Sequence, residues 1–136
     1  MARKFEDYSP IAKEDGIVTN KKFGYTTGAG STVTQITNRA TGVTINAVCG
    51  TITTDSTSLA AEASAVFVVT NSKVDIGDVV VVCQRSGAVA LNTDVVVSAV
   101  AAGSFSITVI NNNVAAGTAE TGAIIINFAV IKAVTS

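Results

Sequence analysis

The chain has 136 residues, of which 48% are hydrophobic and 14% charged, with a net charge of −1 and no histidine. This length fits one domain with a single core, and the longest apolar runs, about five residues as in 79–83, are far shorter than the ~20 residues of a membrane helix. The slightly acidic balance gives no basic surface for nucleic acid, and the lack of histidine removes the usual general base of hydrolases.

We expect residues 1–28 to form an extended N-terminal arm, since they show neither helical nor alternating periodicity. The first ten residues, MARKFEDYSP, mix acidic and basic side chains where a signal peptide would have a basic start and an apolar run. The arm also holds four of the seven aromatic residues of the chain. Aromatic rings in an irregular segment favour contact with another surface, because they offer a large area at little cost in entropy. The arm can fold back on its own domain, but we favour contacts with a partner or a neighbouring subunit, made by Arg3, Lys4, Phe5, Tyr8, Phe23 and Tyr25.

Residues 29–136 are expected to form an all-β domain. Short segments rich in Val, Ile, Thr and Phe are separated by turn residues, among them the Asn-Asn-Asn run at 111–113. The predicted strands are residues 31–37, 43–47, 51–54, 65–70, 78–84, 93–100, 104–110 and 123–133. About eight strands of this spacing predict an antiparallel β-sandwich, a jelly roll or a related Greek key.

Two of the predicted strands have no polar face. Residues 104–110 alternate between apolar and Ser or Thr positions, as expected for a strand with one face in solvent. Residues 79–83 are apolar throughout, and 123–133 place Ile124, Ile126, Phe128 and Val130 on one face and Ile125, Ala129 and Ile131 on the other. A two-layer sandwich covers only one face of each sheet, so we expect other subunits to cover the second face.

The distribution of charge favours the same interpretation. Nine of the 19 charged residues lie within the first 22 positions. The remaining 114 residues carry ten charged residues, under a tenth, where an ordinary soluble domain has about a quarter. So sparsely charged a surface is prone to association, and we predict a homo-oligomer.

No group of residues indicates catalysis or a metal site. We expect Cys49 and Cys83 to be two buried thiols rather than a disulfide or part of a zinc site, which needs four clustered ligands. Asp75, Asp78 and Asp94 could approach one another at strand ends, but the Asp-Ile-Gly-Asp run at 75–78 has the composition of a turn. We therefore expect no enzyme, no cofactor, and neither nucleic acid nor membrane as a partner.

Residues 30–54, GSTVTQITNRATGVTINAVCGTITT, resemble a segment of small structural proteins of tailed bacteriophages. These include capsid decoration (cement) proteins and components of head or tail fibres. The resemblance continues in FVVTNSKVDIGDVVVVC, AAGSFSITVINNN and AIIINFAVIKA, and it covers most of residues 30–133. It implies a β-sandwich protein of the virion surface, commonly trimeric, with no catalytic residues.

The resemblance implies a specific role, a decoration protein made in the host cytoplasm that binds the outer capsid surface as a homotrimer. It would contact the major capsid protein and stabilise the joints between capsomers. One alternative is a fibre or tail component, although we expect no shaft or receptor-binding tip because Ser136 directly follows the last predicted strand. A second alternative is a carbohydrate-binding sandwich, which usually needs exposed Trp or Tyr platforms. The domain has no Trp, and both tyrosines lie in the arm.

Overall fold

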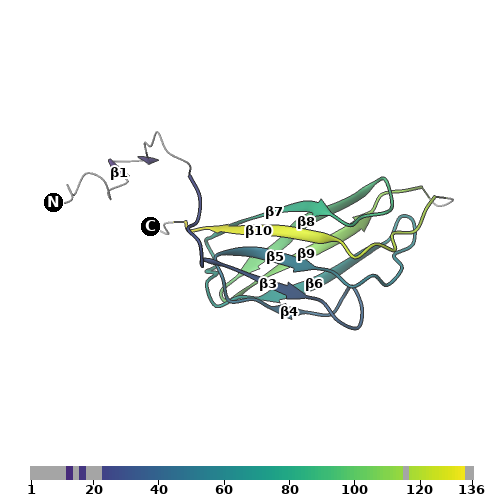
Figure 1. The fold of residues 1–136 in the computed structure, drawn as a ribbon, viewed down its shortest axis with the longest axis horizontal. Coiled ribbons are helices and arrows are strands. Elements are labelled where there is room, and N and C mark those ends of the chain that lie inside the picture. The colour runs from purple at the N-terminus through teal and green to yellow at the C-terminus, as the bar shows by residue number, and fades with distance from the viewer. Residues whose placement is uncertain (1–11, 14–15, 18–22, 115–116, 134–136) are drawn as a thin grey trace.

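The structure, a computed structural model, describes residues 12–13, 16–17, 23–114 and 117–133. Near the N-terminus, β1 (Ala12–Lys13) and β2 (Gly16–Ile17) pair antiparallel in a two-stranded sheet of their own. The remaining eight strands form two four-stranded sheets that pack face to face (Figure 1). The predicted all-β sandwich is therefore confirmed.

Each sheet has two inner strands and two edge strands. The first has the order β3 (Gly30–Thr34), β5 (Cys49–Thr53), β10 (Ile125–Ile131), β7 (Val79–Ser86), and is called the β10 sheet below. The second has the order β4 (Val43–Thr44), β6 (Ser64–Thr70), β9 (Ser104–Asn111), β8 (Thr93–Ala101), and is called the β9 sheet. All eight predicted strands are present, with ends displaced by a few residues.

The strand order differs from that of a jelly roll. Strands β3 to β8 alternate between the two sheets, and β3 pairs parallel to β5 as β4 pairs parallel to β6. Strands β9 and β10 each run antiparallel to both of their neighbours. The chain therefore crosses from one sheet to the other at each step up to β8. A hairpin then leads into β9, which lies between β6 and β8, and β10 lies between β5 and β7 in the other sheet. The expected antiparallel pairing is right at the centre of each sheet and wrong at β3 and β4, whose partners are reached by crossing between sheets rather than by a hairpin.

The core lies between the two sheets, and β9 and β10 pass through its middle. Phe105 of β9 and Phe128 of β10 face each other, with ring centroids 5.5 Å apart and planes tilted by 45°. Of the two faces predicted for the last strand, the one formed by Ile124, Ile126, Phe128 and Val130 is the inward face, since all four are buried. Replacing either phenylalanine by alanine should cost about 3–5 kcal/mol of stability, the usual effect of removing a large core side chain.

Candidate interaction surface

The paired outward positions of the β10 sheet carry no charged side chain. Strand register identifies these positions, since residues paired with the outward positions of β10 point to the same side. They are Gly30, Thr32 and Thr34 of β3; Cys49, Thr51 and Thr53 of β5; Ile125, Asn127, Ala129 and Ile131 of β10; and Val79, Val81, Cys83 and Ser86 of β7. Among all residues of these four strands, the one charged residue is Arg85, which lies at an irregularity near the end of β7.

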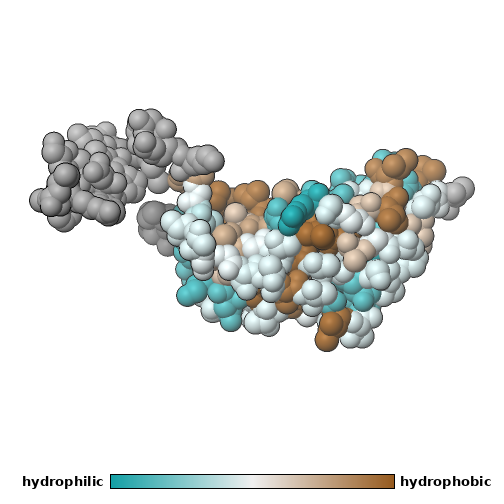
Figure 2. Space-filling model, in the orientation of Figure 1, coloured by the Kyte–Doolittle hydropathy of each residue, from teal (hydrophilic) through white to brown (hydrophobic). Residues whose placement is uncertain are grey.

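This outer face divides into a polar part and an apolar part. Threonines occupy four of the six outward positions of β3 and β5, and the Thr51 hydroxyl donates to Oδ1 of Asn127 at 3.1 Å. Toward β7 the outward residues are apolar, and Val79, Val81 and Ile131 are each about half exposed. Figure 2, viewed from this side, shows brown hydrophobic residues near the end of the sheet at which β10 ends. That other subunits cover this face, as the sequence leads us to expect, remains a prediction.

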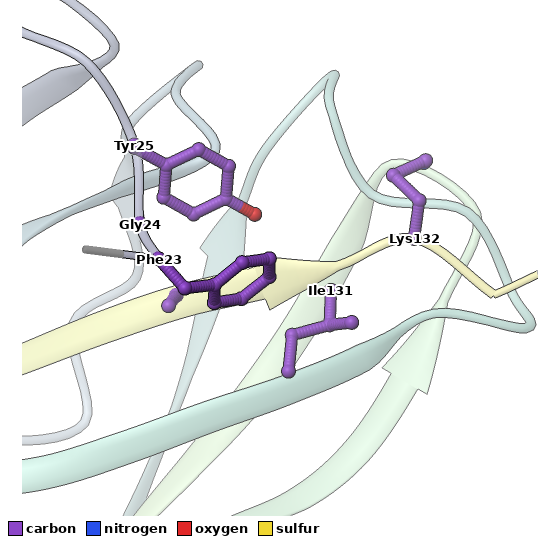
Figure 3. A pocket seen from close by; sticks show the side chains of 6 residues that line it. Phe23, Gly24, Tyr25, Ile131 and Lys132 are labelled. Carbon is purple, nitrogen blue, oxygen red and sulfur yellow. The ribbon is translucent and has the colours of Figure 1, made fainter. Parts of the chain in front are cut away.

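Phe23 and Tyr25 extend the apolar part beyond the strands. The Tyr25 hydroxyl donates a hydrogen bond to the carbonyl oxygen of Val130, which fixes this end of the arm to β10. Phe23, Gly24 and Tyr25 line a hollow together with Ala129, Ile131 and Lys132 (Figure 3). Phe23 remains 78% exposed and Tyr25 47%. Residues 23–25 thus contact their own domain while presenting aromatic surface outward.

The other predicted contact residues cannot be placed against this surface. Arg3, Lys4, Phe5 and Tyr8 lie outside the described residues, so their contacts with a subunit or a partner stay a prediction. The structure does bring together Phe23 and Tyr25, the two members of the predicted set that it describes.

Both cysteines face outward, against expectation. Cys49 is half-buried, Cys83 is exposed, and neither forms a disulfide. Each falls on the outward phase of its strand, in register with Ala129 and Asn127 of β10, respectively. The expected burial was wrong because β5 and β7 each have one inward and one outward face, and composition alone does not assign the phase.

Lys132 closes the rim of the hollow with its charge neutralised. Its Nζ donates to Oδ2 of Asp75 at 2.7 Å and to Oδ2 of Asp78 at 2.6 Å. The Lys132 hydrogen bond and that from the Asp75 backbone N–H lower the pKa of Asp78, and the two carboxylates raise the pKa of Lys132. Asp94 does not join them, since it accepts from Asn112 in the other half of the sandwich. The interpretation of residues 75–78 as a turn agrees with this arrangement.

At the opposite end of β10, where the strand begins, Glu120 is fully buried. Its carboxylate accepts hydrogen bonds from the backbone N–H groups of Val89, Ala90 and Gly122 and, at 2.7 Å, from the Thr93 hydroxyl. Burial raises the pKa of Glu120, but these hydrogen bonds outweigh it and the pKa lies below its ordinary value. The carboxylate thereby fixes the loop after β7 to the loop before β10.

Arg39 is the second buried charge at this end. Its guanidinium donates to the carbonyl oxygens of Thr57, Glu120 and Gly122, and to the Thr54 hydroxyl. Burial lowers the pKa of Arg39, and the nearby negative charge of Glu120 opposes that shift. The guanidinium thus joins the loop after β5 to the same loop before β10. Sequence reasoning assigned no role to Arg39 or Glu120, although Arg39 is the only charged residue between positions 28 and 50.

The outer face of the β9 sheet is more polar along its centre. Its exposed valines, Val66, Val68 and Val96, lie on the flanking strands β6 and β8. On β9 the register places Ser106 and Thr108 between them. Serine and threonine hydroxyls therefore interrupt the apolar surface on this side.

Compared with protein-family models, curated proteins and solved structures, the chain gives no match. Within the part of the chain that the structure describes, no helix is long and apolar enough to cross a membrane. In the same residues, no cluster of three or more His, Cys, Asp or Glu side chains is arranged to hold a metal ion.

Proposed function

We propose that this chain is a non-enzymatic structural protein of a bacteriophage virion, a capsid decoration protein that binds the outer capsid surface as a homotrimer. The resemblance of residues 30–133 to small phage structural proteins supports the virion location. The uncharged outer face of the β10 sheet carries the argument for assembly, since a monomer rarely leaves a whole sheet face without charge.

Energetics favour several weak contacts over one strong contact. An apolar footprint of about 400 Å² contributes roughly 10 kcal/mol at about 25 cal/mol per Å². Association costs roughly 4–15 kcal/mol, so a single footprint of this size gives little net affinity. A trimer that places three footprints on the capsid at once gains avidity, because binding of the first raises the effective concentration of the other two. The decoration protein would hold neighbouring capsomers together in this way.

The arm supplies the proposed contact with the shell. Arg3, Lys4, Phe5 and Tyr8 combine two cationic and two aromatic side chains, residue types that are enriched where interfaces are most strongly held. Their proposed target is the major capsid protein. The sandwich would then form the trimer and present the three arms together.

Co-sedimentation with capsids tests the function directly. Capsids of the parent virus that lack the protein should bind the purified chain to saturation, and binding should raise the temperature at which they release DNA. A variant with Arg3, Lys4, Phe5 and Tyr8 all replaced by Ala should stay assembled but lose capsid binding. Failure of the wild-type chain to co-sediment, or its location on the tail in labelled virions, would contradict a decoration role and favour the fibre or tail alternative.

One observation bears on the carbohydrate-binding alternative. Phe23 and Tyr25 present exposed rings beside a hollow, as sugar-binding platforms do. The polar groups there are already engaged, because the Tyr25 hydroxyl bonds to Val130 and Lys132 bonds to Asp75 and Asp78. Few donors remain for sugar hydroxyls, so we favour a protein partner. Binding to a glycan array that is lost in Tyr25→Ala would reverse this preference.

A further inference from the structure

We propose that copies of this chain associate through the outer face of the β10 sheet, and that Phe23 and Tyr25 of each copy extend the contact. The occupants of this face are thus other copies of the chain, and in the proposed homotrimer the three faces would meet around the three-fold axis. The inference names the assembly surface of the proposed structural protein, but it needs no capsid and can be tested with the purified chain alone.

The first argument is the charge of the surface. The fourteen outward residues of the sheet include no charged side chain. A charged partner would lose its hydration there without gaining an opposite charge, which is costly. Lys132 at the rim is neutralised by Asp75 and Asp78 of its own chain. At these fourteen positions, copies of the chain therefore meet without burying an unpaired charge; the exposed Arg85 near the end of β7 and the Lys132–Asp75–Asp78 group lie at the edges of the face.

The second argument is the contrast between the two sheets. On β10 the outward residues are Ile125, Asn127, Ala129 and Ile131, whereas on β9 they are Ser104, Ser106, Thr108 and Ile110. In the β10 sheet, the outward Ala129 and Ile131 of β10 lie directly beside Val81 and Val79 of the edge strand β7. The outward residues of β9 form no such apolar pairs with the edge strand β8. The apolar strip continues into the hollow formed with Phe23 and Tyr25. This continuity selects the β10 sheet rather than the β9 sheet as the interface.

The third argument is area. Four strands of five to eight residues, spaced by about 4.8 Å and rising about 3.3 Å per residue, cover roughly 400 Å². A stable interface buries about 800 Å² on each partner, so the sheet face alone is too small. Partly exposed aromatic rings add on the order of 150 Å² each. With Phe23 and Tyr25 included, the surface approaches the required size, which explains why residues 23–25 are held against β10.

The matched variants Val81→Asp and Val68→Asp test which face is used. Val81 is 49% exposed on the β10 sheet and Val68 is 48% exposed on the β9 sheet. The same substitution should therefore change the stability of the domain to a similar extent in the two variants. Native mass spectrometry and sedimentation velocity should show an oligomer for the wild-type chain and for Val68→Asp. For Val81→Asp we expect the dissociation constant to rise at least about tenfold, because each contact would bury a carboxylate without a partner.

The thiol of Cys83 gives an independent measurement on the unaltered chain. Cys83 is exposed in a single copy and lies on the proposed interface. Its alkylation by iodoacetamide, followed by peptide mass, should slow as the protein concentration rises and the face becomes covered. This measurement decides the matter if Val81→Asp loses its β-sheet circular dichroism and so fails to fold.

Several results would overturn the proposal: a wild-type chain that is monomeric, assembly lost in Val68→Asp and kept in Val81→Asp, or Cys83 alkylation independent of concentration. Capsid co-sedimentation is measured separately. An oligomer that does not bind capsids would refute the decoration role but not this interface. A monomer that binds capsids would refute this interface but not the decoration role.

Discussion

The two ends of β10 differ in their exposed side chains and buried charges. Where the strand begins, Glu120 and Arg39 are buried and hydrogen-bonded to the surrounding loops. Where it ends, Ile131 is half exposed and Phe23 is mostly exposed above it. At the first end the buried charges are satisfied within one chain, although Val89 and Leu91 of the loop after β7 are exposed. The second leaves apolar surface in water, as expected of a surface that other copies cover.

The contrast separates stability from assembly. A side chain at the polar end should affect the free energy of unfolding of each subunit, because its partners are all in the same chain. An exposed apolar side chain at the other end, such as Phe23, should affect association and leave the isolated domain almost unchanged. Variants at the two ends can therefore show whether the two properties are independent.

The largest effect is expected from Glu120→Ala. This change leaves the backbone N–H groups of Val89, Ala90 and Gly122 and the Thr93 hydroxyl without their acceptor. It also removes the larger of the two negative charges that act on Arg39, the other being Asp55. Breaking a buried, charged hydrogen-bond network costs about 3–5 kcal/mol. Urea unfolding at a fixed, dilute protein concentration measures the loss.

The control for this change is Asp94→Ala. Asp94 is exposed and accepts from Asn112, so its loss should cost at most about 0.5 kcal/mol. If Glu120→Ala cost no more than Asp94→Ala, the polar end would not be the stabilising network that the contacts indicate.

A smaller loss is expected from Gly122→Ala, which tests the packing of the same two loops. A Cβ at Gly122 would lie 1.9 Å from the carbonyl oxygen of Gly87, a backbone atom that cannot rotate away. The loops must separate, at a cost of about 1–3 kcal/mol. Gly24→Ala is the matched control, because a Cβ there meets no atom within 4 Å. Equal unfolding midpoints for the two variants would show that the loops are not tightly packed.

Acid should weaken the polar end. The pKa of Glu120 in the folded chain lies below its ordinary value of 4.5, so its contribution is fully present above about pH 4.5 and is lost as the pH falls through the folded pKa. The pKa of Asp78 is also lowered, from 3.8, and acts in the same direction. Unfolding free energies measured between about pH 7 and pH 3 should therefore fall with acid, and less steeply in Glu120→Gln. An unchanged slope in that variant would exclude Glu120 as the responsible group.

Periodicity predicted the strands but not all of their pairing. The alternation of Phe105, Ile107 and Val109 with hydroxyl residues assigned β9 and its inward face correctly. The parallel pairing of β3 with β5 depends on a crossing between sheets, and no local pattern records which strand the chain will meet after it crosses. Strand phase was equally inaccessible in the apolar run at 79–83 of β7, where the exposure of Cys83 was missed.

The aromatic residues of the arm and the buried charges show opposite limits of sequence reasoning. Phe23 and Tyr25 were predicted as contact residues because aromatic rings in an irregular segment need a surface. Arg39 bonds to the loop around Glu120, 81 positions further along the chain. Only the fold shows that these two distant segments are in contact. An isolated charge in a long uncharged stretch, as at Arg39, is the one signal that could have indicated a buried role.

At the apolar end, Phe23→Ser should weaken assembly and leave the domain intact. Phe23 is 78% exposed in one chain, so its loss should change the unfolding free energy of a dissociated subunit by less than about 0.5 kcal/mol. In the assembly its ring would be covered, and losing it should cost about 1–2 kcal/mol per contact, or roughly tenfold in the dissociation constant. Ile36→Ser is the control, because Ile36 is 71% exposed but follows β3 at the other end of the sandwich. Sedimentation of the two variants side by side measures the difference. If both dissociate at the same concentration as the wild-type chain, residues 23–25 serve only to attach the arm to β10.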